Sequence, residues 1–198
     1  MQKDTRPALA EESSPHPGTE GLWTFVFIDM AIFLLIFFTF MSERLRHFEV
    51  YSASQLHLNE LFGLANTVIL LTSSWMVVEA VQAARKQLAK KVSAYLMGAF
   101  LLGALFSINK LIEYTLKFDA GITPITNPFF SFYFFITIVH FMHVIAGMIF
   151  IFYFNNNSNA CVTSDKYVTG LENVGLFWHY VDVLWIFIFP LLYLVGRK

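Results

Sequence analysis

The chain has 198 residues, of which 57% are hydrophobic, 18% are aromatic and only 14% are charged. A soluble domain carries about 25% charged residues, so this composition indicates a membrane protein. The formal net charge of −1 argues against a nucleic-acid partner, and the one cysteine, Cys161, excludes an intrachain disulfide, a CxxCH haem attachment and a thiolate-rich metal cluster.

Residues 1–20 form a polar segment that contains Pro7, Pro15 and Pro17, and we expect a flexible tail there. The segment does not follow the pattern of a secretory signal peptide, because the apolar run after it is long enough to cross a membrane. The remainder, residues 21–198, is expected to be one membrane domain.

Five apolar runs follow, and each has roughly 20 residues or more, enough to cross a hydrocarbon core of about 30 Å. Because a spanning helix satisfies its backbone polar groups internally, the sequence predicts an all-α bundle of five transmembrane helices. The predicted spans are residues 22–42, 61–84, 92–117, 128–154 and 173–196. A run of asparagines at 155–159 is expected to end the fourth helix.

Basic residues indicate how the spans are oriented. Arg85, Lys86, Lys90 and Lys91 flank the very short connection between the second and third spans. Since lysine and arginine near span ends favour the cytoplasmic side, we expect the N-terminus inside and the C-terminus outside.

Contacts between the helices are harder to predict. Spans that are apolar on all faces give no amphipathic signal, so periodicity does not show which face meets which neighbour. Small residues let helix backbones approach closely and are therefore expected at helix contacts. The candidates are Gly98, Gly103, Ala146 and Gly147.

The first span contains a single charged residue, Asp29, among apolar neighbours. A charge inside a hydrocarbon-spanning helix costs roughly 2.5–3.5 kcal/mol, so such a residue normally faces protein, water or a partner charge. Two interpretations stay open. Asp29 exchanges protons, or it is a hydrogen-bonding acid that tethers the first helix to a neighbour.

The polar groups of the second and third spans have simpler interpretations. Glu79 lies close to the inner end of its span and is expected to reach water or Arg85. Lys110 and Glu113 are three residues apart on one helix face, which predicts a structural ion pair.

The fourth and fifth spans carry polar pairs at helical spacing. His140 and His143 share one face, and so do His179 and Asp182. On paper, this set could supply ligands for a metal ion or a haem. A di-iron bundle site, however, needs several carboxylates in Glu-x-x-His arrangements on four helices, and the chain lacks that pattern.

Two segments in these last spans resemble subunit III of the haem–copper oxidases. Residues 178–185 read WHYVDVLW, which is similar to the family signature W-H-F-V-D-x-x-W, and Glu172 precedes them where the family also has an acid. Residues 140–147 read HFMHVIAG, similar to the family's H-G-x-H-V-x-x-G.

Two earlier segments complete the order. Asn66-Thr67 in the second span and Glu113-Tyr114 in the third lie where the family has them, and the resemblance covers nearly all of residues 21–194. The chain resembles the five-span bacterial members. Asp29 stands where the mitochondrial-type proteins carry a carbodiimide-reactive glutamate. Residues 21–30 (GLWTFVFIDM) and 58–67 (LNELFGLANT) look closest to the branch associated with nitric oxide reductases.

The resemblance implies a non-redox accessory subunit in the bacterial inner membrane. Such a subunit binds no haem or copper, packs against catalytic subunit I of an oxidase or nitric oxide reductase, holds phospholipid in a cleft, and supports proton uptake and the durability of its partner. Haem and copper would belong to partner subunits. Asp29 is expected to face a lipid-filled or water-containing cleft.

The other polar residues are expected to serve architecture. The predicted structural polar network comprises Asn66, Glu79, Glu113, His140, His143, Glu172, Trp178, His179 and Asp182, with His179 and Asp182 joining the fifth helix to the third and fourth. Two alternatives remain open: an independent haem- or metal-binding redox protein, and a small transporter that uses Asp29 and the Lys110/Glu113 pair.

Overall fold

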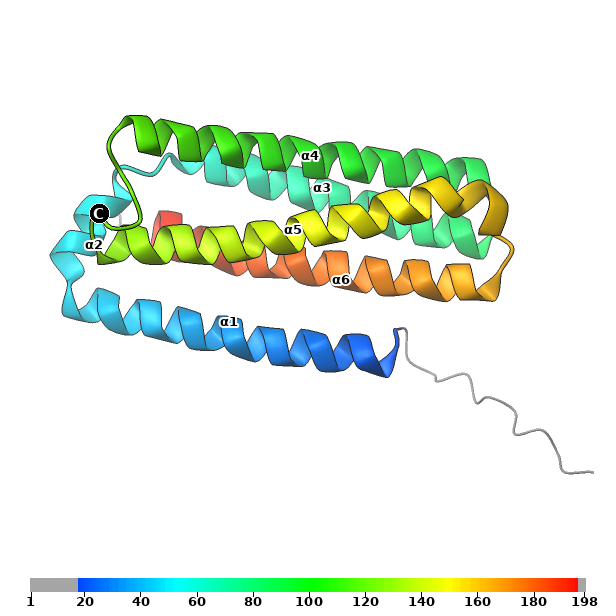
Figure 1. The fold of residues 1–198 in the computed structure, drawn as a ribbon, viewed down its shortest axis with the longest axis horizontal. Coiled ribbons are helices and arrows are strands. Elements are labelled where there is room, and N and C mark those ends of the chain that lie inside the picture. Colours follow the sequence, from blue (N-terminus) through cyan, green and yellow to red (C-terminus); the bar gives the residue numbers. More distant parts are fainter. Residues whose placement is uncertain (1–17, 196–198) are drawn as a thin grey trace, which may run out of the picture.

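The computed structural model describes residues 18–195, and all regular elements in this range are helical (Figure 1). In chain order they are α1 (Glu20–Arg46), α2 (Phe48–Gln55), α3 (Glu60–Arg85), α4 (Ala89–Asp119), α5 (Pro128–Cys161), α6 (Asp165–Phe189) and a π-helical turn, η1 (Pro190–Leu194). Nearly all of the predicted tail at 1–20 lies outside the described residues.

The predicted five-span, all-α architecture is confirmed. Helices α1, α3, α4, α5 and α6 are long and apolar enough to cross a membrane. Each extends beyond its apolar run at one or both ends, because a helix continues where polar side chains satisfy its last turns.

The asparagine run at 155–159 does not end the fourth spanning helix. Helix α5 continues to Cys161. Asn157 Nδ2 donates to the Tyr153 carbonyl oxygen at 2.8 Å, and Ser93 Oγ of α4 donates to Asn155 Oδ1 at 2.9 Å. These bonds satisfy the polar side chains without leaving the helix, so the run extends α5 past its apolar part.

The short helix α2 and the turn η1 were not expected from the sequence, and both lie at the end of the bundle near the C-terminus (Figure 1). The π-helical turn begins at Pro190, which has no N–H to donate to the preceding turn. The Val195 N–H bonds the Pro190 carbonyl oxygen at 3.0 Å, the i→i+5 pattern of a π-helix.

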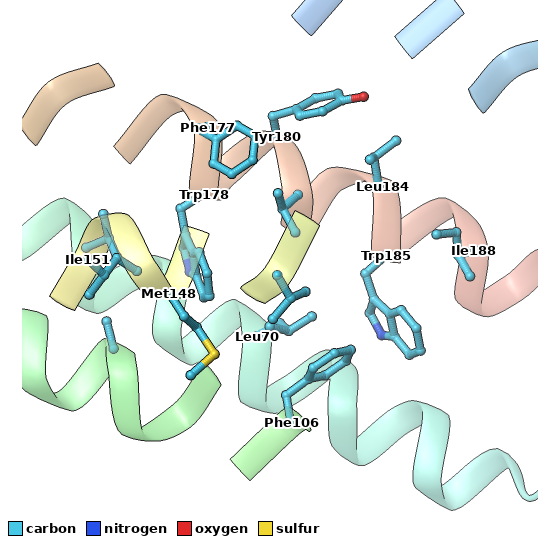
Figure 2. Packing of buried hydrophobic residues seen from close by; sticks show 14 of the residues in the cluster. Leu70, Phe106, Met148, Ile151, Phe177, Trp178, Tyr180, Leu184, Trp185 and Ile188 are labelled. Atoms are coloured by element: carbon cyan, nitrogen blue, oxygen red, sulfur yellow. The ribbon is translucent and has the colours of Figure 1, made fainter. Parts of the chain in front are cut away.

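Helices α3 to α6 form a four-helix bundle, and α1 lies along its outside next to α5 and α6 (Figure 1). The bundle interior is filled by large side chains, among them Trp178 and Trp185, both from α6 and both buried (Figure 2). In α1, by contrast, Phe33, Phe40 and Arg44 are its buried residues.

Two of the predicted small residues, Gly103 and Gly147, leave space for the Trp178 ring. They are thereby confirmed as sites of close helix contact. A Cβ atom at Gly147 of α5 would lie 2.5 Å from the Trp178 ring, and one at Gly103 of α4 would lie 3.1 Å from it. Three helices therefore meet at this indole, because glycine on two of them lets the third approach.

Candidate functional site

Asp29 fastens the outer helix α1 to the bundle. Tyr180 of α6 donates its hydroxyl to Asp29 Oδ2 at 2.6 Å, and His143 Nε2 of α5 lies 3.2 Å from the same oxygen. Figure 2 shows the Tyr180 hydroxyl pointing away from the core toward α1. Phe25 and Phe33 of α1 pack their rings on His143 on either side of this contact.

The orientation of His143 is set by the backbone of its own helix. His143 Nδ1 lies 2.8 Å from the Val139 carbonyl oxygen, which only accepts hydrogen bonds, so Nδ1 is the nitrogen that donates. Nε2 on the other side of the ring lies next to the Asp29 carboxylate of α1. The pair thus joins α5 to α1.

A cleft of about 640 Å³ adjoins this pair, between the N-terminal half of α1 and helices α5 and α6. Its lining is mostly aromatic or apolar and includes Phe25, Phe150, Phe154 and Phe177, with His143 as its titratable side chain. At the end of the cleft, the Thr19 N–H bonds Asn173 Oδ1 at 2.9 Å and ties the start of α1 to α6.

A second polar group is closed inside the bundle around Lys110. Its ammonium donates to Glu113 Oε2 at 3.0 Å, to Tyr193 Oη at 3.0 Å and to Tyr133 Oη at 3.3 Å. Both tyrosine hydroxyls donate in turn to Glu113 Oε1, at 2.6 Å and 2.8 Å.

Every donor of the Lys110 ammonium is thus occupied, which confirms the predicted Lys110–Glu113 ion pair. Four ring centroids, those of Tyr114, Tyr133, Trp185 and Tyr193, also lie 5.0–5.6 Å from Lys110 Nζ. Cation–π attraction adds to the stabilisation of the buried cation.

A third polar group lies between α3 and α6. Ser74 Oγ is 2.5 Å from His179 Nδ1 and is also the polar neighbour of Asp182. Within residues 18–195, the two Asp182 oxygens make no hydrogen bond of normal geometry. One end of this interface is closed by an ion pair in which Arg85 Nη2 lies 2.9 Å from Glu172 Oε1.

The residues that sequence analysis expected in one network are therefore divided among separate clusters. Glu113 belongs to the Lys110 group, His143 to Asp29, and His179 to Ser74. His179 and Asp182 face α3, not the third and fourth spanning helices α4 and α5 as expected. Helices that are apolar on all sides carry no periodic signal, so the sequence did not show which helix these two residues would face.

The remaining predicted network members lie elsewhere in the core. His140 is buried between the rings of Phe106 and Trp185, and neither of its nitrogens has a hydrogen-bond partner in the described part of the chain. The same holds for Trp178 Nε1. Asn66 Oδ1 accepts from Asn109 Nδ2 at 3.2 Å.

Glu79 was expected to reach water or Arg85. Arg85 pairs with Glu172, 87 residues further along the chain, and Glu79 is half-buried. The local spacing of Glu79 and Arg85 thus did not identify the acid that pairs with Arg85. Sequence analysis also missed Ser74, Tyr133, Tyr180 and Tyr193. Tyr180 was detectable in principle, since it stands between His179 and Asp182 in the matched segment.

In the described residues, no three side chains of histidine, cysteine, aspartate or glutamate converge closely enough to hold one metal ion. The histidine and aspartate positions on which the haem or metal alternative depended lie in different clusters. A metal site built from three or more of these side chains therefore has no converging donor set among residues 18–195.

Comparison with known proteins gives consistent matches over most of the chain. The family described as cytochrome c oxidase subunit III matches residues 18–197. The chain is similar to a cytochrome bo(3) ubiquinol oxidase subunit 3 of Pseudomonas aeruginosa, with 29% identity over 89% of this chain and 84% of the relative.

Two other bacterial relatives are similar at comparable levels. One is a cytochrome bo(3) ubiquinol oxidase subunit 3 of Buchnera aphidicola, with 28% identity over 89% of this chain and 93% of that protein. The other is a probable quinol oxidase subunit 3 of Staphylococcus aureus, with 27% identity over 99% of this chain and 98% of that protein.

Proposed function

The chain belongs to the cytochrome c oxidase subunit III family, and from that membership we propose that it is the non-redox accessory subunit of a bacterial respiratory haem–copper terminal oxidase or nitric oxide reductase. Its five apolar helices and its bacterial relatives make it a multi-pass bacterial membrane protein. We assign it to the inner membrane, with catalytic subunit I as its partner. That partner holds the haem and copper and performs the redox chemistry.

The observation that carries this proposal is the way α1 is fastened along an apolar cleft by Asp29. The ionisable groups at this contact lie on α1, α5 and α6 and contact one another, which stabilises the packing of these three helices. A cleft of about 640 Å³ is within the range of ligand-binding pockets. Its lining offers aromatic and apolar surface to a ligand of the same character.

We propose that this cleft holds the acyl chains of a phospholipid. Phe150, Phe154 and Phe177 provide a lining that matches hydrocarbon, whereas Thr19 and Asn173 at the end of the cleft are already bonded to each other. Lipid in this position would fill the space between α1 and the bundle next to the Asp29–His143 pair.

Asp29 is our candidate for the proton-related acid. It is a partly exposed carboxyl next to the cleft, and it lies 3.2 Å from the imidazole of His143, a second group that can carry a proton. In this role Asp29 would support proton uptake by the catalytic partner and prolong its active lifetime.

Native co-purification tests the assignment of the chain as an accessory subunit. The tagged full chain, extracted from the source membrane in mild detergent, is expected to bring down a haem- and copper-containing partner in fixed stoichiometry. Oxygen or nitric oxide consumption by the complex then identifies the type of partner. Recovery of the chain alone, with oxidase activity of equal lifetime in a deletion strain, would contradict the proposal.

Asp29→Asn tests the proton role within that complex. We expect assembly to be retained, because asparagine still accepts a hydrogen bond from Tyr180, and the turnover or active lifetime of the partner to fall. The matched control is Thr39→Val, which removes a hydroxyl on the same helix that donates to the Leu35 carbonyl oxygen of α1 itself. Unchanged turnover and lifetime in Asp29→Asn would leave Asp29 a tether alone.

A further inference from the structure

A second, more polar cleft enters the bundle between α3 and α6. It has a volume of about 250 Å³. The Arg85–Glu172 ion pair and Gln82 line the part nearest the helix ends, and His179 lines the part farthest along both helices. A histidine is thus presented to a cleft whose mouth carries charged groups that retain water.

Beyond His179, two further groups continue in the same direction. Ser74 lies one turn deeper on α3 than Val78 of the cleft lining, and its Oγ contacts His179 Nδ1 at 2.5 Å. Asp182 lies one turn deeper on α6 than His179 and has Ser74 as its polar neighbour. The order from the cleft inward is therefore imidazole, hydroxyl, carboxyl.

Asp182 is the inner end of this series. Its residue is 4% exposed, and both carboxylate oxygens lack a hydrogen-bond partner of normal geometry within residues 18–195. Buried polar atoms in membrane helices are normally satisfied, so an unpartnered carboxyl aimed at a serine hydroxyl calls for an explanation.

We propose that the α3–α6 cleft is a proton-access site, in which His179 and Ser74 pass a proton from water to the carboxylate of Asp182. Water in the cleft protonates His179 Nε2. The Nδ1 hydrogen moves to Ser74 Oγ, and the original Ser74 hydroxyl hydrogen moves to an Asp182 oxygen. One proton leaves the water and one arrives at Asp182, with His179 and Ser74 each neutral again.

The route ends at Asp182, which makes this carboxyl a proton store that is loaded from one side of the membrane. That side is the one bearing the Arg85–Lys91 connection. The helices around the route also carry charged and titratable groups within their apolar parts or at the mouth of the cleft. Among them are Glu79 and Arg85 of α3, Glu172 and Tyr180 of α6, Asp29 of α1, Lys110 and Glu113 of α4, and His140 and His143 of α5. Arg85 is paired with Glu172, Lys110 with Glu113, and Asp29 with Tyr180 and His143.

This inference goes beyond the accessory role, and it is tested on the full chain without any partner, so its failure would leave the proposed function standing. The measurement is infrared spectroscopy of the chain in lipid nanodiscs across pH 4–10. Asp182 should give a protonated-carboxyl band that appears as the pH is lowered. The band should shift with ¹³C-aspartate labelling and vanish in Asp182→Asn.

The decisive readout is the rate at which this band exchanges hydrogen for deuterium. Ser74→Ala removes the bridging hydroxyl and should slow the exchange about 10²-fold, the scale of one positioned proton-transfer group. Ser73→Ala is the matched control, because Ser73 is the adjacent buried serine and donates to the Ala99 carbonyl oxygen of α4 instead. It should leave the rate unchanged.

Two outcomes would overturn the proposal. One is an exchange rate in Ser74→Ala equal to that of the wild type and of Ser73→Ala. The other is the absence of an aspartate carboxyl band that depends on Asp182 at any pH in the range. If Asp182→Asn fails to fold, ¹³C-aspartate labelling combined with Asp29→Asn, which removes the other intramembrane aspartate, assigns the band by subtraction.

Discussion

Asp29 and Asp182 both lie within apolar spans, but Asp29 is partly exposed and Asp182 is buried, and their surroundings differ. Asp29 accepts a hydrogen bond from Tyr180 and contacts His143, so its charge is compensated by groups on two other helices. Asp182 has Ser74 as its polar neighbour and lacks a normal hydrogen bond within the described residues. Asp29 thus joins helices in addition to the proton role proposed for it, whereas Asp182 is suited to receive a proton.

Tyr51 is a buried residue on α2, outside the spans, and its hydroxyl has no hydrogen-bond partner in the described part of the chain. Burial, helped by Glu43, raises the pKa of the Tyr51 hydroxyl to about 12. Tyr51→Phe should therefore cost no stability and should raise the unfolding free energy by about 1 kcal/mol, because an unsatisfied buried hydroxyl is removed.

The same change should alter the response to alkali. The folded-state pKa of Tyr51 lies above the ordinary value near 10, so the hydroxyl ionises first in the unfolded chain. The free energy of unfolding of the wild type is therefore unaffected by this group below about pH 10 and falls as the pH rises toward 12. Thermal unfolding in detergent at pH 8 and pH 11 checks this, with the wild type losing more stability than Tyr51→Phe. Equal losses would contradict the assignment.

At the scale of elements, the Lys110 cluster joins α4, α5 and η1. Lys110 and Glu113 come from α4, Tyr133 from α5 and Tyr193 from η1. The ion pair itself was predictable because its members are three residues apart. The two tyrosines were not predictable, because Lys110 and Tyr193 are 83 residues apart in the chain and no local pattern links them.

Lys110→Met should destabilise the bundle by about 3–5 kcal/mol, because it leaves Glu113 buried without its counter-charge. The double variant Lys110→Met/Glu113→Leu should recover part of this loss, because no uncompensated charge stays buried, while the hydroxyls of Tyr133 and Tyr193 lose Glu113 as their acceptor. Unfolding by sodium dodecyl sulfate in mixed micelles measures both. A double variant no more stable than the single one would show that the charges themselves are required.

Helix packing around Trp178 gives a second prediction at this scale. Gly147→Ala would place a Cβ atom 2.5 Å from the Trp178 ring and should cost about 1–3 kcal/mol through overpacking. Gly21→Ala is the matched control, because within the described residues no atom of another side chain lies within 4 Å of its Cβ position. It should be neutral or stabilise α1 by up to about 1 kcal/mol, as thermal unfolding of both variants would show.

At the scale of the whole molecule, the number and order of the spans were predictable because apolar length alone decides them. How the helices face one another was not. Glu79 and Arg85 illustrate the difference: both lie near one end of α3, yet Arg85 reaches Glu172 on the last helix. Which helix surfaces meet depends on pairs such as Gly147 and Trp178, which lie on different helices and come together only in the folded structure.

The orientation across the membrane is a prediction of the same scale. In a variant whose native Cys161 is replaced by serine, a cysteine at Gln87 should react with an impermeant maleimide only from the cytoplasmic face. A cysteine at Asn59, at the opposite end of α3, should react only from the outside. The reverse pattern would place the N-terminus outside and would move the mouth of the α3–α6 cleft with it.

The fastening of α1 by Asp29 also has a consequence for biosynthesis. Asp29 and Tyr180 are 151 residues apart in the chain, and Thr19 and Asn173, the second hydrogen-bonded pair between the start of α1 and α6, are 154 residues apart. At about 5–20 residues per second, the ribosome needs roughly 8–30 s to make that stretch. During this interval the first span is in the membrane before its acid has both of its partners, and a charge without any partner there costs roughly 2.5–3.5 kcal/mol. Completion of α6 ends that interval, so the last helix made is the one that closes the fold around the first.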